Sequence, residues 1–252
     1  MSATETTIVL PDTVVVVGAA RGIGRAIAAD LSALGCAVVA VDVEAAVEEL
    51  ATSDARCSAL VADVTADDTA SRVGELVTAT EPGTTGLVYA AFTEERAPFT
   101  DGTPEGWART VDVSVHGAAR LLRALPTWPG ARAAVLVGSV HARATMPGFS
   151  AYAVAKAGLT GLVRASALEL GSLGIRVNEV DPGFVQVERN EHVWSDPSGR
   201  DRVARSYPLG RLAEPHDVAT VVRFLLGDDS AYVTGASIPV DGGLLTQLPE
   251  NR

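Results

Sequence analysis

Residues 14–34 read VVVVGAARGIGRAIAADLSAL and join three features in direct succession. Four consecutive valines predict a short strand that is buried on both faces. The glycines Gly18, Gly22 and Gly24 follow at once and lead into a segment with the apolar spacing of a helix. Glycine lets a backbone turn sharply and approach a phosphate, which the positive end of the helix dipole then attracts. The stretch therefore predicts a phosphate-binding turn, with an ordinary strand–helix turn as the alternative.

The same alternation of apolar runs and helix-like segments continues along the chain and predicts βαβ units with a parallel sheet. We expect seven strands, at 14–17, 37–41, 58–62, 86–90, 133–137, 175–180 and 237–240. We expect helices between them, at 25–34, 45–50, 67–80, 104–125 and 151–173. The segment 184–208 breaks the alternation and is predicted to be a mobile insertion over a site. Neither a repeat nor a linker interrupts residues 1–252, so we expect one α/β domain.

Composition and charge exclude several classes of function. The 252 residues carry a formal net charge of −11, which argues against nucleic acid and against an anionic membrane surface as partners. Cys36 and Cys57 are too few for a disulfide framework or a metal site, so we expect two buried, inert thiols and no metal. The first ten residues lack the basic start of a signal peptide, and no apolar run approaches about 18 residues. These features predict a soluble, cytoplasmic protein.

The chain contains 20 basic residues, of which 19 are arginine and one is lysine, Lys156. An ammonium is a compact charge whose pKa moves readily on burial, whereas a guanidinium stays charged in essentially every setting. Either Lys156 does something that arginine cannot do, or it is a surface lysine that survived by chance.

Several spaced motifs together give the chain a resemblance to a known family. The glycine turn has the spacing G-x-x-x-G-x-G, Ser139 stands 13 residues before Tyr152, and Lys156 stands four after it. Pro182-Gly183 follows a predicted strand, and Val-Thr-Gly and Asp-Gly-Gly motifs lie near the C-terminus, at 233–235 and 241–243. Over nearly its whole length the chain resembles the short-chain dehydrogenase/reductase family. The resemblance implies a doubly wound Rossmann fold, a nicotinamide dinucleotide and assembly into a homotetramer or homodimer.

The resemblance also implies roles for individual residues. Tyr152 would exchange a proton with the substrate, Lys156 would lower the pKa of that phenol and bind the nicotinamide ribose, and Ser139 would hold the substrate oxygen. Ser114 occupies the position of a fourth catalytic residue, an asparagine in the family. The residues expected to bind the cofactor are Gly18, Arg21, Gly22, Ile23, Gly24, Asp42, Asp63, Val64, Ala90, Tyr152, Lys156, Pro182, Gly183 and Val185.

The choice between NAD and NADP depends on Asp42, which ends the second predicted strand about 20 residues beyond the glycine turn, at the usual position for a ribose-binding carboxylate. A 2′-phosphate beside that carboxylate would be repelled by about 1–3 kcal/mol, which favours NAD. Arg21 is a basic residue and favours NADP instead, unless its side chain pairs with solvent or with Asp42. Asp63 and Val64 either contact adenine or are a helix cap and a buried valine.

Three positions depart from the family pattern. Residues 89–92 read YAAF instead of Asn-Asn-Ala-Gly, so the sheet edge needs another brace, and Phe92 is expected to narrow the mouth of the nicotinamide site. Ser114 replaces the asparagine that supports a proton-relay water. Val187 replaces a threonine that contacts the carboxamide.

The expected substrate pocket is mostly apolar and suits a ring or an alkyl body. Arg143 is either a carboxylate anchor or a solvated loop residue, and the charge run 94–96 is predicted to be a solvated loop. We predict an NAD-dependent dehydrogenase or ketone reductase acting on a secondary alcohol. A cis-dihydrodiol dehydrogenase forming a catechol, and a dinucleotide-binding regulator with weak turnover, remain alternatives. The residues expected to contact substrate are Phe92, Val140, His141, Phe149 and Trp194.

Overall fold

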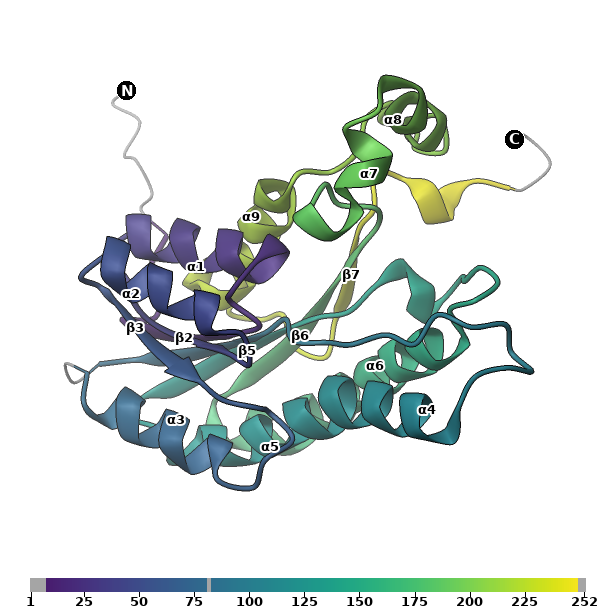
Figure 1. The fold of residues 1–252 in the computed structure, drawn as a ribbon. Coiled ribbons are helices and arrows are strands. Elements are labelled where there is room, and N and C mark those ends of the chain that lie inside the picture. The colour runs from purple at the N-terminus through teal and green to yellow at the C-terminus, as the bar shows by residue number, and fades with distance from the viewer. Residues whose placement is uncertain (1–7, 81–82, 249–252) are drawn as a thin grey trace, which may run out of the picture.

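The computed structural model describes residues 8–80 and 83–248. Its centre is one sheet of seven parallel strands in the order β3-β2-β1-β4-β5-β6-β7, which confirms the predicted doubly wound α/β fold (Figure 1). The strands lie within one or two residues of the predicted positions: β1 Thr13–Val17, β2 Ala37–Asp42, β3 Cys57–Val61, β4 Thr85–Tyr89, β5 Ala131–Val137, β6 Arg176–Pro182 and β7 Ser237–Val240.

Helices cover both faces of the sheet in two layers (Figure 1). One layer consists of α1 Gly22–Ala33, α2 Glu48–Ser53 and α9 Pro215–Leu226. The other contains α3 Thr69–Thr78, α4 Pro104–Val111, α5 Gly117–Ala124 and α6 Ser150–Leu170. Short turns join them: η1 Ala45–Val47, η3 Leu125–Thr127, η4 Val140–Ala142, η5 Gly171–Leu173, η7 Asp228–Ser230 and η8 Leu244–Thr246.

The valine run that opens β1 explains why the sheet needs two helical layers. Its side chains alternate, so that Val14 and Val16 pack under α1 while Val15 and Val17 pack toward α5. All four are fully buried. Because β1 pairs with β2 on one side and β4 on the other, the strand order reverses at β1, and ligands of such sheets bind at the carboxyl ends beside that point.

The predicted helix 104–125 is interrupted, which corrects the sequence-based prediction. After α4 the chain makes a π-helical turn, η2 Asp112–His116, before α5 begins. The Tyr89 hydroxyl, at the end of β4, donates a 2.5 Å hydrogen bond to the Val113 carbonyl inside this turn. The side chain that replaces the family's asparagine therefore provides a brace of its own between the sheet and the helix.

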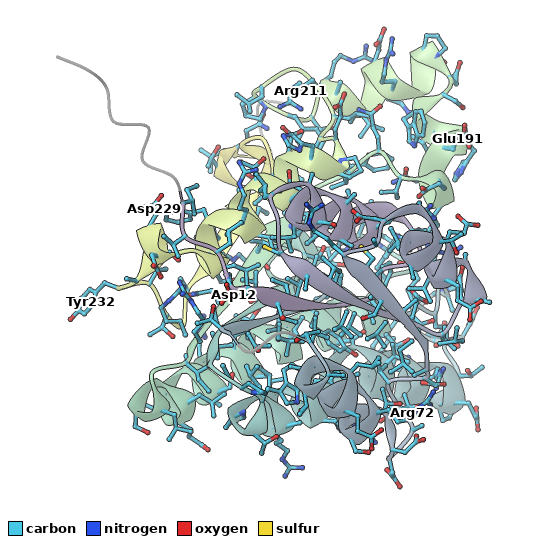
Figure 2. All side chains as sticks on the ribbon, turned by 90° about the vertical axis from the view of Figure 1, so that its left-hand side faces the viewer. Asp12, Arg72, Glu191, Arg211, Asp229 and Tyr232 are labelled. Carbon is cyan, nitrogen blue, oxygen red and sulfur yellow. The ribbon has the colours of Figure 1, made fainter. Side chains whose placement is uncertain are left out.

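The segment 184–208 contains short helices, namely η6 Glu188–Asn190, α7 Glu191–Trp194 and α8 Pro197–Ala204. Figure 1 shows α7 and α8 beyond the sheet and outside both helical layers. In Figure 2, which draws all described side chains, Glu191 at the start of α7 lies far from the strands.

The expectation that both thiols are buried is confirmed. Cys36 and Cys57 are buried and free, and burial raises the pKa of both thiols, that of Cys36 to about 11. Within the described ranges, no helix is long and apolar enough to cross a membrane. The prediction drawn from the first ten residues falls largely on residues 1–7, outside the described part.

Candidate active site

The turn between β1 and α1 has a backbone geometry that only glycine allows. Gly18 has φ +82°, and a Cβ on it would lie 2.6 Å from the Ala91 nitrogen. A Cβ on Gly24 would lie 1.9 Å from the Gly18 carbonyl oxygen. Helix α1 begins at Gly22 without a side-chain cap, so its first N–H groups are open to an anionic ligand. The turn therefore fits the pyrophosphate of a dinucleotide.

Asp42 ends β2 beside this turn and is held by two backbone groups. The N–H of Ala20 donates to Asp42 Oδ2 at 2.9 Å, and the N–H of Glu44 donates to Oδ1 at 3.0 Å. Arg21 forms an ion pair with Glu44, not with Asp42. The carboxylate of Asp42 is thus fixed at the carboxyl edge of the sheet, while the positive charge of Arg21 is engaged by a neighbour.

A single cavity of about 1000 Å³ runs from Asp42 to the carboxyl ends of β4, β5 and β6. Every residue predicted to bind the cofactor lines this cavity, and Ser139 lines it too. Asp63 lies in its wall, where it accepts hydrogen bonds from Thr65 and pairs with Arg109 at 2.9 Å. The volume accommodates a dinucleotide together with part of a small substrate.

Helix α6 places Tyr152 and Lys156 one turn apart, so both side chains face the cavity. Lys156 is only 2% exposed, and its ammonium donates a 2.7 Å hydrogen bond to the Val137 carbonyl at the end of β5. Burial lowers the pKa of Lys156 to about 8. The only lysine in the chain is therefore buried against the cavity and is not a surface lysine.

Ser139 follows β5 and caps the turn η4, where its Oγ accepts a hydrogen bond from the His141 N–H at 3.2 Å. Burial raises the pKa of Tyr152 to about 12, and a hydrogen bond with Ser139 opposes this shift. The three residues singled out by their spacing thus meet at one end of the cavity, although the first and the last stand 17 positions apart in the sequence.

Aromatic rings surround Tyr152 on the substrate side. The ring centroids of His141, Phe92 and Phe149 lie 5.5, 5.7 and 6.2 Å from that of Tyr152. His141 also forms a hydrogen bond with Thr145 through Nδ1 at 2.9 Å, and burial lowers the pKa of its imidazole, which favours the neutral ring. The predicted pocket residues Phe92, Val140, His141 and Phe149 all line the cavity.

The charge run 94–96 is not the solvated loop that the sequence suggested. Glu94 has a side chain only 12% exposed and forms ion pairs with both Arg96 and Arg189, each at 2.7 Å. The two guanidinium groups lie 4.7 Å from the ring centroids of Phe149 and Phe92 respectively. This cluster was missed because Arg189 lies far away in the sequence, and only the fold brings it to the loop after β4.

Three further predictions need correction or refinement. Trp194 does not line the cavity, because its indole N–H donates to the Val187 carbonyl at 2.9 Å. Arg143 is no carboxylate anchor, since it forms a 3.3 Å ion pair with the buried Asp181. Ser114 is fully buried in η2, outside the cavity lining, and its hydroxyl has no hydrogen-bond partner among the described residues.

Comparisons with known proteins agree with this geometry. Residues 18–245 match the family model described as Enoyl-(Acyl carrier protein) reductase. The mouse (3R)-3-hydroxyacyl-CoA dehydrogenase is 34% identical over 247 residues, covering 91% of this chain and 94% of that protein. The 3beta-hydroxysteroid dehydrogenase 1 of Eggerthella lenta is 33% identical over 244 residues, covering 92% and 93%.

A solved structure shares the fold over nearly the whole chain. The crystal structure of a putative gluconate dehydrogenase from Agrobacterium tumefaciens superposes with a TM-score of 0.84 and 26% identity, covering 94% of this chain and 96% of that one. Together with the glycine turn and the Ser139, Tyr152 and Lys156 cluster, these similarities establish that the chain is an oxidoreductase of the short-chain dehydrogenase/reductase family.

Proposed function

We propose that this protein interconverts a secondary alcohol and a ketone with NAD(H). The observation that carries the proposal is one cavity with a fixed carboxylate, Asp42, at its nucleotide end and Ser139, Tyr152 and Lys156 at its other end. A nicotinamide dinucleotide held in this cavity would supply the hydride acceptor for oxidation of the alcohol and the hydride donor for reduction of the ketone.

Different residues of the cavity would bind different parts of the nucleotide. The glycine turn would receive the pyrophosphate at the start of α1, and Asp42 would accept hydrogen bonds from the adenosine ribose. NAD is favoured because a 2′-phosphate would lie against the Asp42 carboxylate, and Arg21 is already paired with Glu44. Lys156 would bind the ribose nearer the nicotinamide.

Tyr152 transfers the proton to or from the substrate oxygen, and Ser139 holds that oxygen in place. In reduction, the phenol donates its proton to the carbonyl oxygen as charge develops there. In oxidation, the phenolate accepts the proton of the alcohol, which requires a lower pKa than the value of about 12 that burial produces. The positive charge of Lys156, whose Nζ lies 5.6 Å from the centre of the Tyr152 ring, acts in that direction.

The rings around Tyr152 favour a largely apolar substrate, cyclic or with an alkyl body. Residues 184–208 cover this side and supply Val185 and Val187 to the cavity. A cis-dihydrodiol fits the same description, so it belongs in the substrate screen, where a catechol product would identify that activity.

The test is a screen of secondary alcohols, cyclic diols and the matching ketones, with NAD and NADP in parallel, followed by the absorbance of the reduced nicotinamide. We expect turnover of at least one apolar secondary alcohol, with NAD preferred. NADH binding without any turnover would instead favour a dinucleotide-binding regulator and contradict the proposal.

A further inference from the structure

Two acidic side chains lie buried beneath the active site. Glu179 and Asp181 stand two residues apart on β6, so both point to the face of the sheet that α6 covers. Both residues are fully buried, at 0% exposure. Burying two carboxylates is costly unless charge or hydrogen bonds compensate for the lost water. Two fully buried carboxyl groups on one strand therefore call for a specific explanation.

The two carboxyl groups converge on Gly138, the residue between β5 and Ser139. A Cβ on Gly138 would lie 2.2 Å from Glu179 Oε1 and 2.3 Å from Asp181 Oδ1, so both oxygens crowd around one point. Neither oxygen forms a hydrogen bond of normal geometry in the described part of the chain, although the Thr160 hydroxyl lowers the pKa of Glu179 and the Ser139 N–H lowers that of Asp181. Two carboxylates this close do not both ionise readily, because their like charges repel.

A proton count at Ser237 leads to the same conclusion. The Ser237 hydroxyl lies 2.9 Å from Glu179 Oε2 and 2.8 Å from Asp181 Oδ2. A hydroxyl has one hydrogen and donates only one such bond. If both carboxyls were ionised, one of the two contacts would join two lone pairs. A single proton on one carboxyl resolves this, because that group donates to Ser237 Oγ while Ser237 donates to the other.

The surroundings indicate which carboxyl keeps the proton. The guanidinium of Arg143 lies 3.3 Å from Asp181 Oδ2 and favours the ionised form of Asp181. Burial raises the pKa of Glu179 to about 7, and the charge of Asp181 adds to that shift. Glu179 is therefore the protonated member below neutral pH.

The pair lies close to Lys156 across the strands. The Lys156 ammonium bonds the carbonyl of Val137, and Val137 is in register with Val180, the residue between the two acids. Burial lowers the pKa of Lys156, whereas both acids raise it. The other charged groups that affect it are Arg189, which lowers its pKa, and Glu94, which raises it.

We propose that Glu179 and Asp181 form a one-proton acid pair whose remaining negative charge keeps the buried ammonium of Lys156 protonated. Both acids are positioning residues, which act on the reaction through Lys156. When the pH rises through neutrality, Glu179 releases its proton to solvent and the counter-charge near Lys156 increases. The importance of the pair for catalysis rests on the proposed function, while its effect on Lys156 does not.

The test uses the fact that Lys156 is the only lysine of the chain. Protein labelled with ¹³C at the lysine Cε gives one side-chain NMR signal, whose shift reports the titration of Lys156 directly. Lys156 titrates above the pH at which Glu179 releases its proton, so both carboxyls are ionised there and each contributes a negative charge. We therefore expect Glu179→Gln and Asp181→Asn each to lower the pKa of Lys156 by about one unit, and the double variant to lower it further. Folding is checked by circular dichroism, and Glu179→Gln decides the outcome if Asp181→Asn does not fold.

The matched control is Asp30→Asn, which removes one carboxylate from α1 in the opposite helical layer. Asp30 is 14% exposed and pairs with Arg223, so its loss leaves the acid pair intact. We expect its Lys156 titration to equal that of the wild type. A folded Glu179→Gln variant with an unchanged Lys156 titration would overturn the proposal.

Infrared spectroscopy detects the proton on Glu179 independently of the Lys156 titration. The infrared spectrum of the wild type at pH 6 should contain the C=O band of a buried, protonated carboxylic acid, and Glu179→Gln should lack it. A band that survives in this variant would contradict the assignment of the proton to Glu179. Because both measurements use nucleotide-free protein, their result is separate from turnover, and failure to find a substrate would count against the proposed function alone.

Discussion

At the scale of single residues, Tyr152 presents the main chemical question of the site. Burial raises its pKa to about 12, so in the nucleotide-free protein the phenol keeps its proton at neutral pH. In this state the residue is ready to donate a proton, as ketone reduction requires. Alcohol oxidation needs the opposite form, which makes the charge of Lys156 more important in that direction.

Asp42 gives a prediction about the choice of nucleotide. Asp42→Asn keeps an oxygen that accepts the Ala20 N–H but removes the charge that would repel a 2′-phosphate. We expect the preference for NAD over NADP, as the ratio of the two kcat/KM values, to fall by about ten-fold, or roughly 1.4 kcal/mol. Steady-state kinetics with both nucleotides measure this ratio. An unchanged ratio would show that Asp42 does not select the nucleotide.

At the scale of elements, the interrupted helix after β4 shows what replaces the missing asparagines. The Tyr89 hydroxyl reaches the carbonyl of Val113 in η2, and Ser114 follows directly, buried and without a hydrogen-bond partner among the described residues. Tyr89 is 1% exposed, so this bond is shielded from water. One buried hydrogen bond therefore ties η2 to the end of β4.

Tyr89→Phe removes that hydrogen bond and leaves the buried carbonyl of Val113 without this donor. We expect a loss of about 1–2 kcal/mol in the free energy of unfolding, measured by denaturant titration. Tyr232→Phe is the matched control, because Tyr232 is fully exposed and its hydroxyl contributes nothing to the core. Equal stability of the two variants would refute the role given to Tyr89.

The glycine turn yields a second prediction at this scale. In Gly24→Ala the new methyl group meets the Gly18 carbonyl at 1.9 Å, so the turn has to move. We expect a loss of about 1–3 kcal/mol in stability and a marked loss of NADH binding by fluorescence titration. Gly171→Ala is the control, since its φ is −58° and no atom beyond its neighbours in the chain lies within 4 Å of the new Cβ. Normal NADH binding by Gly24→Ala would contradict the proposed phosphate site.

The helices and strands also show which features of the fold and the site could be predicted from the sequence alone. The strands, the glycine turn and the spacing of Tyr152 and Lys156 were predictable, because each depends on residues close together in the chain. The π-helical turn was not, because it depends on Tyr89 and Val113, which belong to different elements. The same holds for the pairing of Glu94 with Arg189. Glu179 and Asp181 carried a signal that was overlooked, namely two acidic residues at alternate positions of the sixth strand.

At the scale of the whole molecule, exposed apolar side chains bear on the predicted assembly. Val154 and Leu168 on α6 are 52% and 83% exposed, and Tyr232, which stands clear of the body in Figure 2, is fully exposed. Val154 and Leu168 share one helix, so the exposed face of α6 is the candidate site for contact with another copy of the chain. We expect a homotetramer or homodimer in solution.

Leu168→Arg tests this assembly by placing a charge on the exposed face of α6. Light scattering coupled to size exclusion should show a smaller species than the wild type, because a buried, unpaired charge at an interface is costly. Glu169→Gln, a change at the next position of the same helix, is the control. A wild type that is monomeric at all concentrations would contradict the predicted assembly.

The central claim, that Tyr152 transfers the proton in a site that holds the nucleotide by other residues, is tested most directly by Tyr152→Phe. Turnover of the best substrate and the Kd for NADH are measured side by side on this variant and the wild type. The account predicts that kcat falls by about 10²–10⁴-fold while the Kd stays within about two-fold. A variant that binds NADH normally and turns over at the wild-type rate would contradict it.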